Sequence, residues 1–210
     1  MMEFHLHIQK MLQGDFQLMR LNIAFVFQVN CPGCFIYGIP LLNELFCKHA
    51  DQIGFIGVST AFEDFELNTE ANTVAFLKEG KLTGETKKYF DSVTHTMCPP
   101  KINFPVAFDR LTNAGKFLTN ENILLVCRQN LNFGLLSSTE HQQMLNSVKE
   151  HYKQCSIIAE TFTLNQLPGT PSIVIFDNHN TVLQSLFGHQ DKELIELFLQ
   201  HYLSLNTISV

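Results

Sequence analysis

The 210-residue chain contains no tryptophan and little charge, with charged residues making up only 16% of it. Its arginines are few and far apart in the sequence, at Arg20, Arg110 and Arg128, and the formal net charge is −6. A protein of this charge repels phosphate groups, so we expect no nucleic-acid partner. The apolar run Leu21–Val29 is too short to span a bilayer, and we therefore expect no transmembrane segment.

The first twenty residues lack the apolar core of a signal peptide. Polar and charged side chains interrupt them at Glu3, His5, His7, Lys10, Asp15 and Arg20. We therefore expect a cytoplasmic location, where six cysteines are not expected to form a structural disulfide framework. Apolar material for a core is ample, since 45% of the residues are hydrophobic and 19 are phenylalanines. We expect one domain over residues 1–210, because no linker or repeat divides the chain.

The most informative motif is a pair of cysteines two residues apart, Cys31-Pro32-Gly33-Cys34. It stands between a predicted strand at Leu21–Val29 and a predicted helix at Cys34–His49. A helix N-terminus points free N–H groups and a positive dipole end at the first sulfur, which favours thiolate over thiol. The thiolate is the nucleophile in disulfide exchange, and a thiol one turn later can resolve the mixed disulfide. The motif predicts Cys31 as nucleophile and Cys34 as resolving thiol.

Strand and helix patterns alternate along the rest of the chain. Strands are predicted at 53–60 and 104–108, and an antiparallel hairpin at 173–187. Helices are predicted at four places: 34–49 with a kink at Pro40, after a cap at Asn68 and ending at Gly80, after a capping box at Ser137–Glu140, and after a cap at Asp191. Residues 110–155 look helical and polar. The order β-α-β-α-β-(helical segment)-β-β-α indicates an α/β protein with parallel βαβ pairing.

A Cys-x-x-Cys after a strand, the strand FPVAFD, and Gly169-Thr170-Pro171 before a strand and hairpin occur together here. This combination resembles the thioredoxin fold, and within it the TlpA-like and AhpC/TSA-like redoxins. The resemblance covers about residues 20–109 and 156–204. It implies a central mixed sheet flanked by helices, with a helical insertion at about 110–155 before the cis-proline strand. No cofactor is implied.

The resemblance also implies the substrate-binding residues. In these redoxins the proline before the strand is cis and lies against the active-site cysteines, which points to Pro171. Thr170 would then offer backbone groups to an extended substrate segment, as in strand addition. Pro32 and Gly33 complete this set of implied substrate-binding residues.

Three positions depart from the redoxin pattern. Asn30 stands where tryptophan usually precedes the first cysteine, and Phe25 stands where many thioredoxins carry a buried acid. Pro40 follows Cys34 by six residues, whereas the helix proline usually follows by five. The pKa values of the cysteines and the redox potential therefore do not carry over from the family.

Four cysteines lie outside the motif. Those in apolar helical contexts are expected to be buried and inert: Cys47, Cys127 and Cys155. Cys98 lies in a proline-rich loop. This position is compatible with exposure to solvent and with a second redox role. A zinc site could combine Cys31, Cys34, Cys98 and His95, but their spacing matches no zinc-finger pattern, so we expect no metal. The acidic run Phe62–Glu66 is either a solvated loop or the source of a proton acceptor for Cys34.

The leading interpretation is a thiol–disulfide oxidoreductase that reduces protein or small-molecule disulfides and is recharged by an upstream thiol reductant. One alternative is a peroxiredoxin-type thiol peroxidase. Its Pro-x-x-x-Thr-x-x-Cys pattern is absent before Cys31. The other alternative is a non-enzymatic binding module that docks a partner through residues 110–155, although the intact Cys31 and Cys34 argue against it.

Overall fold

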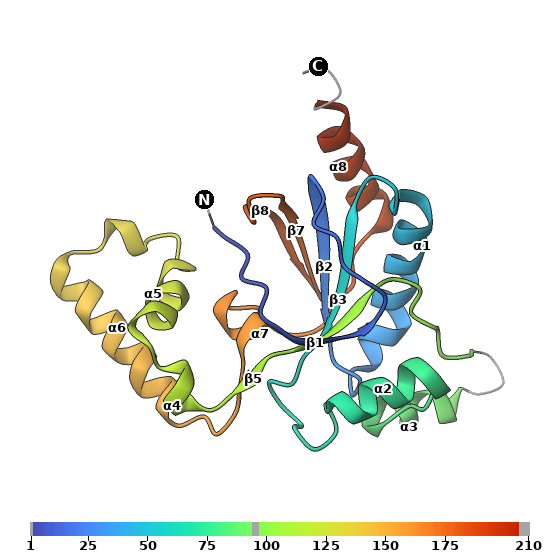
Figure 1. The fold of residues 1–210 in the computed structure, drawn as a ribbon, viewed down its shortest axis with the longest axis horizontal. Helices are drawn as coiled ribbons and strands as arrows, with labels where there is room; N and C mark the ends of the chain where they lie inside the picture. Colours follow the sequence, from blue (N-terminus) through green and yellow to red (C-terminus); the bar gives the residue numbers. More distant parts are fainter. Residues whose placement is uncertain (1, 94–96, 206–210) are drawn as a thin grey trace.

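A six-stranded mixed sheet forms the centre of the computed structural model, which describes residues 2–93 and 97–205 (Figure 1). The strands are, in spatial order, β1 (Ile8–Gln13), β4 (Val106–Asp109), β3 (Gly54–Ser59), β2 (Leu21–Phe27), β7 (Ser172–Asp177) and β8 (Val182–Phe187). The central strands β2, β3 and β4 pair in parallel, and β1, β7 and β8 join by antiparallel pairing. The predicted mixed sheet is confirmed.

One face of the sheet is covered by helices. These are a π-helical turn (Cys34–Gly38), α1 (Ile39–His49), α2 (Glu70–Glu79), α3 (Gly84–Ser92) and α8 (Lys192–Leu205). Alternate residues of β2 point to this face, among them Phe25 and Phe27, and pack with Phe35 and Phe104. Ala24 and Val26, which alternate with them along the strand, are buried on the opposite face. Within the described ranges, the helices lack the combination of length and apolar character that a membrane span needs.

The opposite face is covered by α7 (Glu160–Leu164) and by an extended segment, residues 2–7, which we call the N-terminal strap. Phe4 of the strap is 1% exposed, and its ring lies 4.7 Å from that of Phe176. The Phe4 N–H donates to the Asn180 carbonyl of the β7–β8 hairpin. The His7 N–H donates to Oγ1 of Thr161 at 2.9 Å, which joins the strap to α7.

The segment predicted as a helical insertion stands beside the sheet (Figure 1). It contains α4 (Ala114–Phe117), α5 (Asn120–Arg128), a 3-10 turn (Phe133–Leu135) and α6 (Ser138–Lys153). The short strands β5 (Leu111–Thr112) and β6 (Ile158–Ala159) pair at its base. Its side chains share a small apolar cluster with β6 and α7, formed around Phe117, Val126, Ile158 and Leu164. The capping box at Ser137 and Glu140 begins α6 as predicted.

One predicted detail is wrong. The cap of α2 is Thr69, whose hydroxyl accepts the Asn72 N–H, while the Asn68 side chain accepts the Asn30 N–H instead. Residues 34–49 are helical as predicted, but they begin with the π turn, and Pro40 lies in the first turn of α1. The kink at Pro40 stays a prediction.

Candidate functional site

The two motif cysteines lie at the edge of the sheet where β2 and β3 end. Their sulfurs are 2.6 Å apart. Cys31 is partly exposed at the surface, whereas Cys34 is completely buried beneath it. The arrangement therefore offers one accessible sulfur with a second sulfur directly behind it.

The surroundings make the two thiols unequal in acidity. A hydrogen bond from the Cys34 thiol is the main cause that lowers the pKa of Cys31 to about 7, against the opposing effect of burial. Hydrogen bonds from the Thr170 side chain and from the N–H groups of Cys34 and Gly33 add to the lowering. Burial raises the pKa of Cys34 well above its usual range, and its hydrogen bond to Cys31 adds to that increase. At neutral pH the exposed sulfur is the one able to react as thiolate.

The loop before β7 lies against the cysteine motif. The Thr170–Pro171 peptide bond is cis. The Thr170 carbonyl accepts a hydrogen bond from the Cys31 thiol at 3.5 Å. A Cβ atom placed on Gly33 would lie 3.9 Å from Cδ of Pro171, so the proline ring borders the motif. The chain thus brings together Cys31-Pro32-Gly33-Cys34 and Thr170-Pro171, the residues that the sequence singled out.

The Phe25 ring packs against the π turn that follows the motif. A Cβ atom on Gly38 would lie 2.5 Å from Cζ of Phe25 and 3.4 Å from Cβ of Pro171. The absence of a side chain at Gly38 lets the π turn approach both rings closely. The position at which many thioredoxins carry a buried acid is therefore filled by packing rather than by a charge.

Asn30 ties the motif to the neighbouring loops in place of the usual tryptophan. Its N–H donates to Oδ1 of Asn68 at 3.0 Å, and its Nδ2 donates to Oδ2 of Asp64 at 2.7 Å. Its Oδ1 accepts the Glu85 N–H at 2.6 Å, at the beginning of α3. Asp64 is exposed and binds Asn30 rather than a sulfur. This position agrees with the interpretation of the acidic run as a solvated loop.

Gln28 is a site residue that the sequence interpretation missed. It is 2% exposed, and its backbone N–H is hydrogen-bonded to the sulfur of Cys34. Its Oε1 accepts the Thr170 hydroxyl at 3.1 Å, and its Nε2 donates to the Glu63 carbonyl at 3.4 Å. The sequence did contain a signal for this residue: its polar side chain interrupts an apolar strand pattern three residues before Cys31.

The remaining cysteines do not all lie where predicted. Cys127 is buried as expected, but Cys47 is exposed and Cys155 is partly exposed. Cys47 follows the buried Leu45 by two residues, or about 200° around the helix, which turns it away from the core. Cys98 is exposed. In the zinc alternative, His95 lies outside the described residues. Among those described, no three His, Cys, Asp or Glu side chains gather as a metal site requires.

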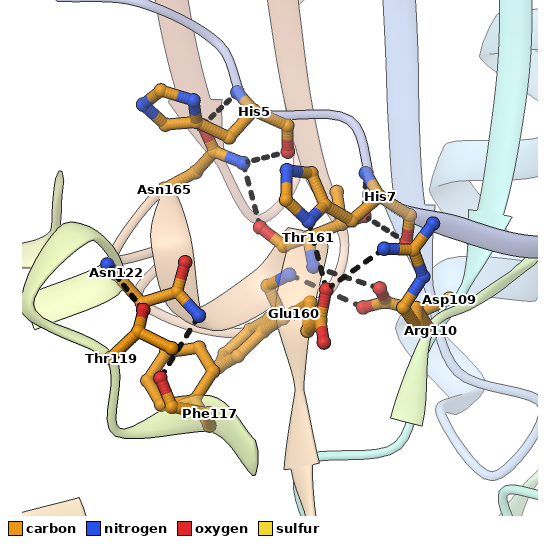
Figure 2. Close-up of polar contacts among 11 residues, drawn as sticks. His5, His7, Asp109, Arg110, Phe117, Thr119, Asn122, Glu160, Thr161 and Asn165 are labelled. Atoms are coloured by element: carbon orange, nitrogen blue, oxygen red, sulfur yellow. Dashed lines mark hydrogen bonds and ion pairs between the residues drawn. The ribbon is translucent and has the colours of Figure 1, made fainter. Parts of the chain in front are cut away.

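A polar cluster holds α7, which leads into the cis-proline loop (Figure 2). The buried Asp109 carboxylate accepts the Thr60 hydroxyl at 2.7 Å and the N–H groups of Thr161 and Phe162 at 2.8 and 3.2 Å. Burial raises the pKa of Asp109 to about 6. Glu160 contacts Nδ1 of His7 at 2.8 Å and Arg110 at 3.5 Å. The cluster joins the ends of β3 and β4, the N-terminal strap and α7.

Two solved structures resemble the chain over nearly its whole length. A thiol-disulfide isomerase from Corynebacterium glutamicum aligns with a TM-score of 0.57 at 20% identity, covering 95% of this chain and 94% of the other. A thioredoxin-like superfamily protein aligns with a TM-score of 0.57 at 19% identity, covering 96% of each chain. At these identities the likeness establishes the fold alone, and the predicted thioredoxin-like fold is confirmed. No protein-family model and no curated protein matches the sequence.

Proposed function

We propose that this protein is a thiol–disulfide oxidoreductase that reduces disulfides through Cys31 and Cys34. The observation that carries the proposal is the unequal pair of thiols, with sulfurs 2.6 Å apart, the pKa of the accessible one lowered to about 7 and that of the buried one raised. An accessible thiolate backed by a protonated thiol is what attack followed by resolution requires.

The reaction proceeds in two exchanges. The Cys31 thiolate attacks one sulfur of the substrate disulfide; a mixed disulfide forms, and the other substrate sulfur leaves as a thiolate that takes up a proton. Cys34 then loses its proton and attacks the Cys31 sulfur, which breaks the mixed disulfide and releases the second substrate thiolate. Two electrons pass from the cysteine pair to the substrate, and the pair becomes a disulfide.

The surface around Cys31 suits an extended substrate segment. Thr170 lies beside Cys31. We propose that its backbone pairs like a strand with a peptide substrate and that Pro32, Gly33 and Pro171 form the adjoining surface. We propose protein disulfides or small-molecule disulfides as substrates and an upstream thiol reductant that returns the pair to the dithiol state. A reducing compartment such as the cytoplasm suits this direction. We further propose that residues 1–210 act as one domain, with 110–155 as its insertion.

The test compares disulfide reduction and peroxide consumption side by side. Wild type with a dithiol reductant is expected to accelerate insulin reduction, Cys31→Ser to abolish the acceleration, and Cys34→Ser to accumulate a mixed disulfide through Cys31. Cys47→Ser, which removes an exposed cysteine outside the site, is the matched control and should behave as wild type. Peroxide consumption without insulin reduction would identify a peroxidase instead. Neither activity, with both cysteines intact, would identify a binding module.

A further inference from the structure

The buried amide of Gln28 joins two loops that lie on either side of the cysteine motif. Its Nε2 donates to the Glu63 carbonyl at 3.4 Å, in the loop after β3, and its Oε1 accepts the Thr170 hydroxyl at 3.1 Å. A carbonyl only accepts hydrogen bonds, so the Glu63 contact fixes the NH₂ group of Gln28 on that side and its oxygen on the Thr170 side. Gln28 therefore presents an acceptor to the loop that carries the cis proline.

Thr170 is held through two different groups. Its hydroxyl donates to Gln28, and its carbonyl accepts a hydrogen bond from the Cys31 thiol at 3.5 Å. The carbonyls of the residues on either side, Gly169 and Pro171, are hydrogen-bonded to other donors. Those bonds fix the path of the loop, whereas the side chain of Thr170 is oriented by its contact with Gln28.

The two contacts of Thr170 respond differently when Cys31 reacts. Attack on a disulfide requires the thiolate, and a thiolate has no proton to donate. The Thr170 carbonyl therefore loses its hydrogen bond from Cys31 at the step in which a substrate is attacked, and it becomes available to a substrate N–H. The hydrogen bond from the Thr170 hydroxyl to Gln28 involves no sulfur and persists through that step.

We propose that Gln28 is a positioning residue that holds the Thr170 hydroxyl and so keeps the Thr170 backbone oriented toward a peptide substrate while Cys31 reacts. The inference rests on the proposed function, because it concerns the strand-like pairing of Thr170 with a substrate. Gln28 acts through Thr170 and contacts no substrate. It favours disulfides within polypeptides, because a small disulfide has no peptide backbone to pair.

The test compares insulin with hydroxyethyl disulfide, which has no peptide backbone, in single turnovers of the reduced protein. Gln28→Leu removes the acceptor, and the Glu63 carbonyl keeps its hydrogen bond from Nδ2 of Asn68 at 3.0 Å. Loss of one hydrogen bond between neutral groups should raise the half-saturating concentration of insulin about three- to tenfold. The rate at saturation and the reduction of hydroxyethyl disulfide should stay unchanged, because only uniform binding is lost. Gln28→Glu keeps an acceptor oxygen and should preserve the preference for insulin.

Thr170→Val removes the same hydrogen bond from its other end, at a partly exposed position. It should reproduce the effect of Gln28→Leu, and the double variant should lose no more than either single variant. It replaces Gln28→Leu if circular dichroism shows that variant to be unfolded. Gln184→Leu changes an exposed glutamine of β8 and is the matched control. No loss with insulin, an equal loss with both disulfides, or additive losses in the double variant would each overturn the inference.

A second measurement needs no substrate. Three-bond NMR couplings to the methyl carbon of Thr170 report the rotamer of its side chain, and they are measured on the reduced protein at about pH 8.5, where Cys31 is ionised. We expect one rotamer in wild type and in Gln28→Glu, and averaging over rotamers in Gln28→Leu. A single unchanged rotamer in Gln28→Leu would overturn the inference. Failure of the wild type to reduce either disulfide would overturn the proposed function, whatever the couplings show.

Discussion

Removing the thiol of Cys34 should make Cys31 less acidic. The hydrogen bond from Cys34 is the main cause that lowers the pKa of Cys31 to about 7. A hydrogen bond to a charged group contributes about 1.5–3 kcal/mol, and one pKa unit corresponds to about 1.4 kcal/mol. Cys34→Ala should therefore raise the pKa of Cys31 by about one to two units. Cys34→Ser keeps a donor at the same place and should change it far less.

The assay is the rate of alkylation of Cys31 as a function of pH. At pH 6 a thiol of pKa about 7 is roughly one-tenth thiolate, and a thiol one to two units less acidic is roughly ten to a hundred times less ionised. A less acidic thiolate is also a better nucleophile, with a Brønsted coefficient of about 0.4–0.5, which offsets part of the loss. The net expectation at pH 6 is a rate about three- to fifteenfold lower in Cys34→Ala than in wild type.

The pair of variants makes this prediction specific. The inflection of the rate should move to higher pH in Cys34→Ala and stay near the wild-type position in Cys34→Ser. An inflection that is unmoved, or moved to lower pH, in Cys34→Ala would refute the assignment of the Cys34 thiol as the principal donor. Equal shifts in both variants would assign the effect to packing at position 34, not to the donor.

Two further predictions concern the elements around the site. Asp109→Asn leaves one acceptor oxygen for three donors, and we expect urea titrations to show an unfolding free energy lower by about 2–3 kcal/mol. Burial raises the pKa of Asp109 to about 6 in the folded protein, from about 3.9 when unfolded. The advantage of wild type should therefore be largest below about pH 4, shrink between about pH 4 and 6, and stay constant above; the opposite trend would contradict this. Gly38→Ala places a methyl group 2.5 Å from Phe25 and should lower the unfolding free energy by about 1–3 kcal/mol. Phe25→Leu should relieve part of that cost, and strictly additive losses in the double variant would argue against the clash.

The sequence predicted the parts of the site that local patterns encode. The strand before Cys31, the helix after Cys34 and the strand after Pro171 each follow from runs of apolar residues and their neighbours. The motif resemblance then places the two segments side by side, although 139 residues separate Cys31 from Thr170. Patterns within a few residues and one family motif were therefore enough for strands β2, β3, β4, β7 and β8 and for the cysteine pair.

Features that depend on the tertiary structure could not be predicted. β1 pairs with β4 through two irregularities in register, so its sequence shows no regular alternation of apolar and polar residues. The contacts of Gln28 join it to Glu63 and Thr170, which lie 35 and 142 residues away in the sequence. A single-sequence pattern contains none of this information.

The N-terminal strap has a consequence for the order in which the chain can fold during its synthesis. His5 and His7 are hydrogen-bonded to Asn165 and Thr161, which lie 160 and 154 positions later in the sequence, in and just after α7. Phe4 packs on Phe176. Residues 4–7 must therefore wait for residues 161–176, which are made later, before that face of the sheet can close. Closing so long a loop is entropically costly, and contacts this distant in sequence slow folding. Until the β7–β8 hairpin emerges, the apolar side chains of β2 and β3 on that face remain open to water and to other nascent chains.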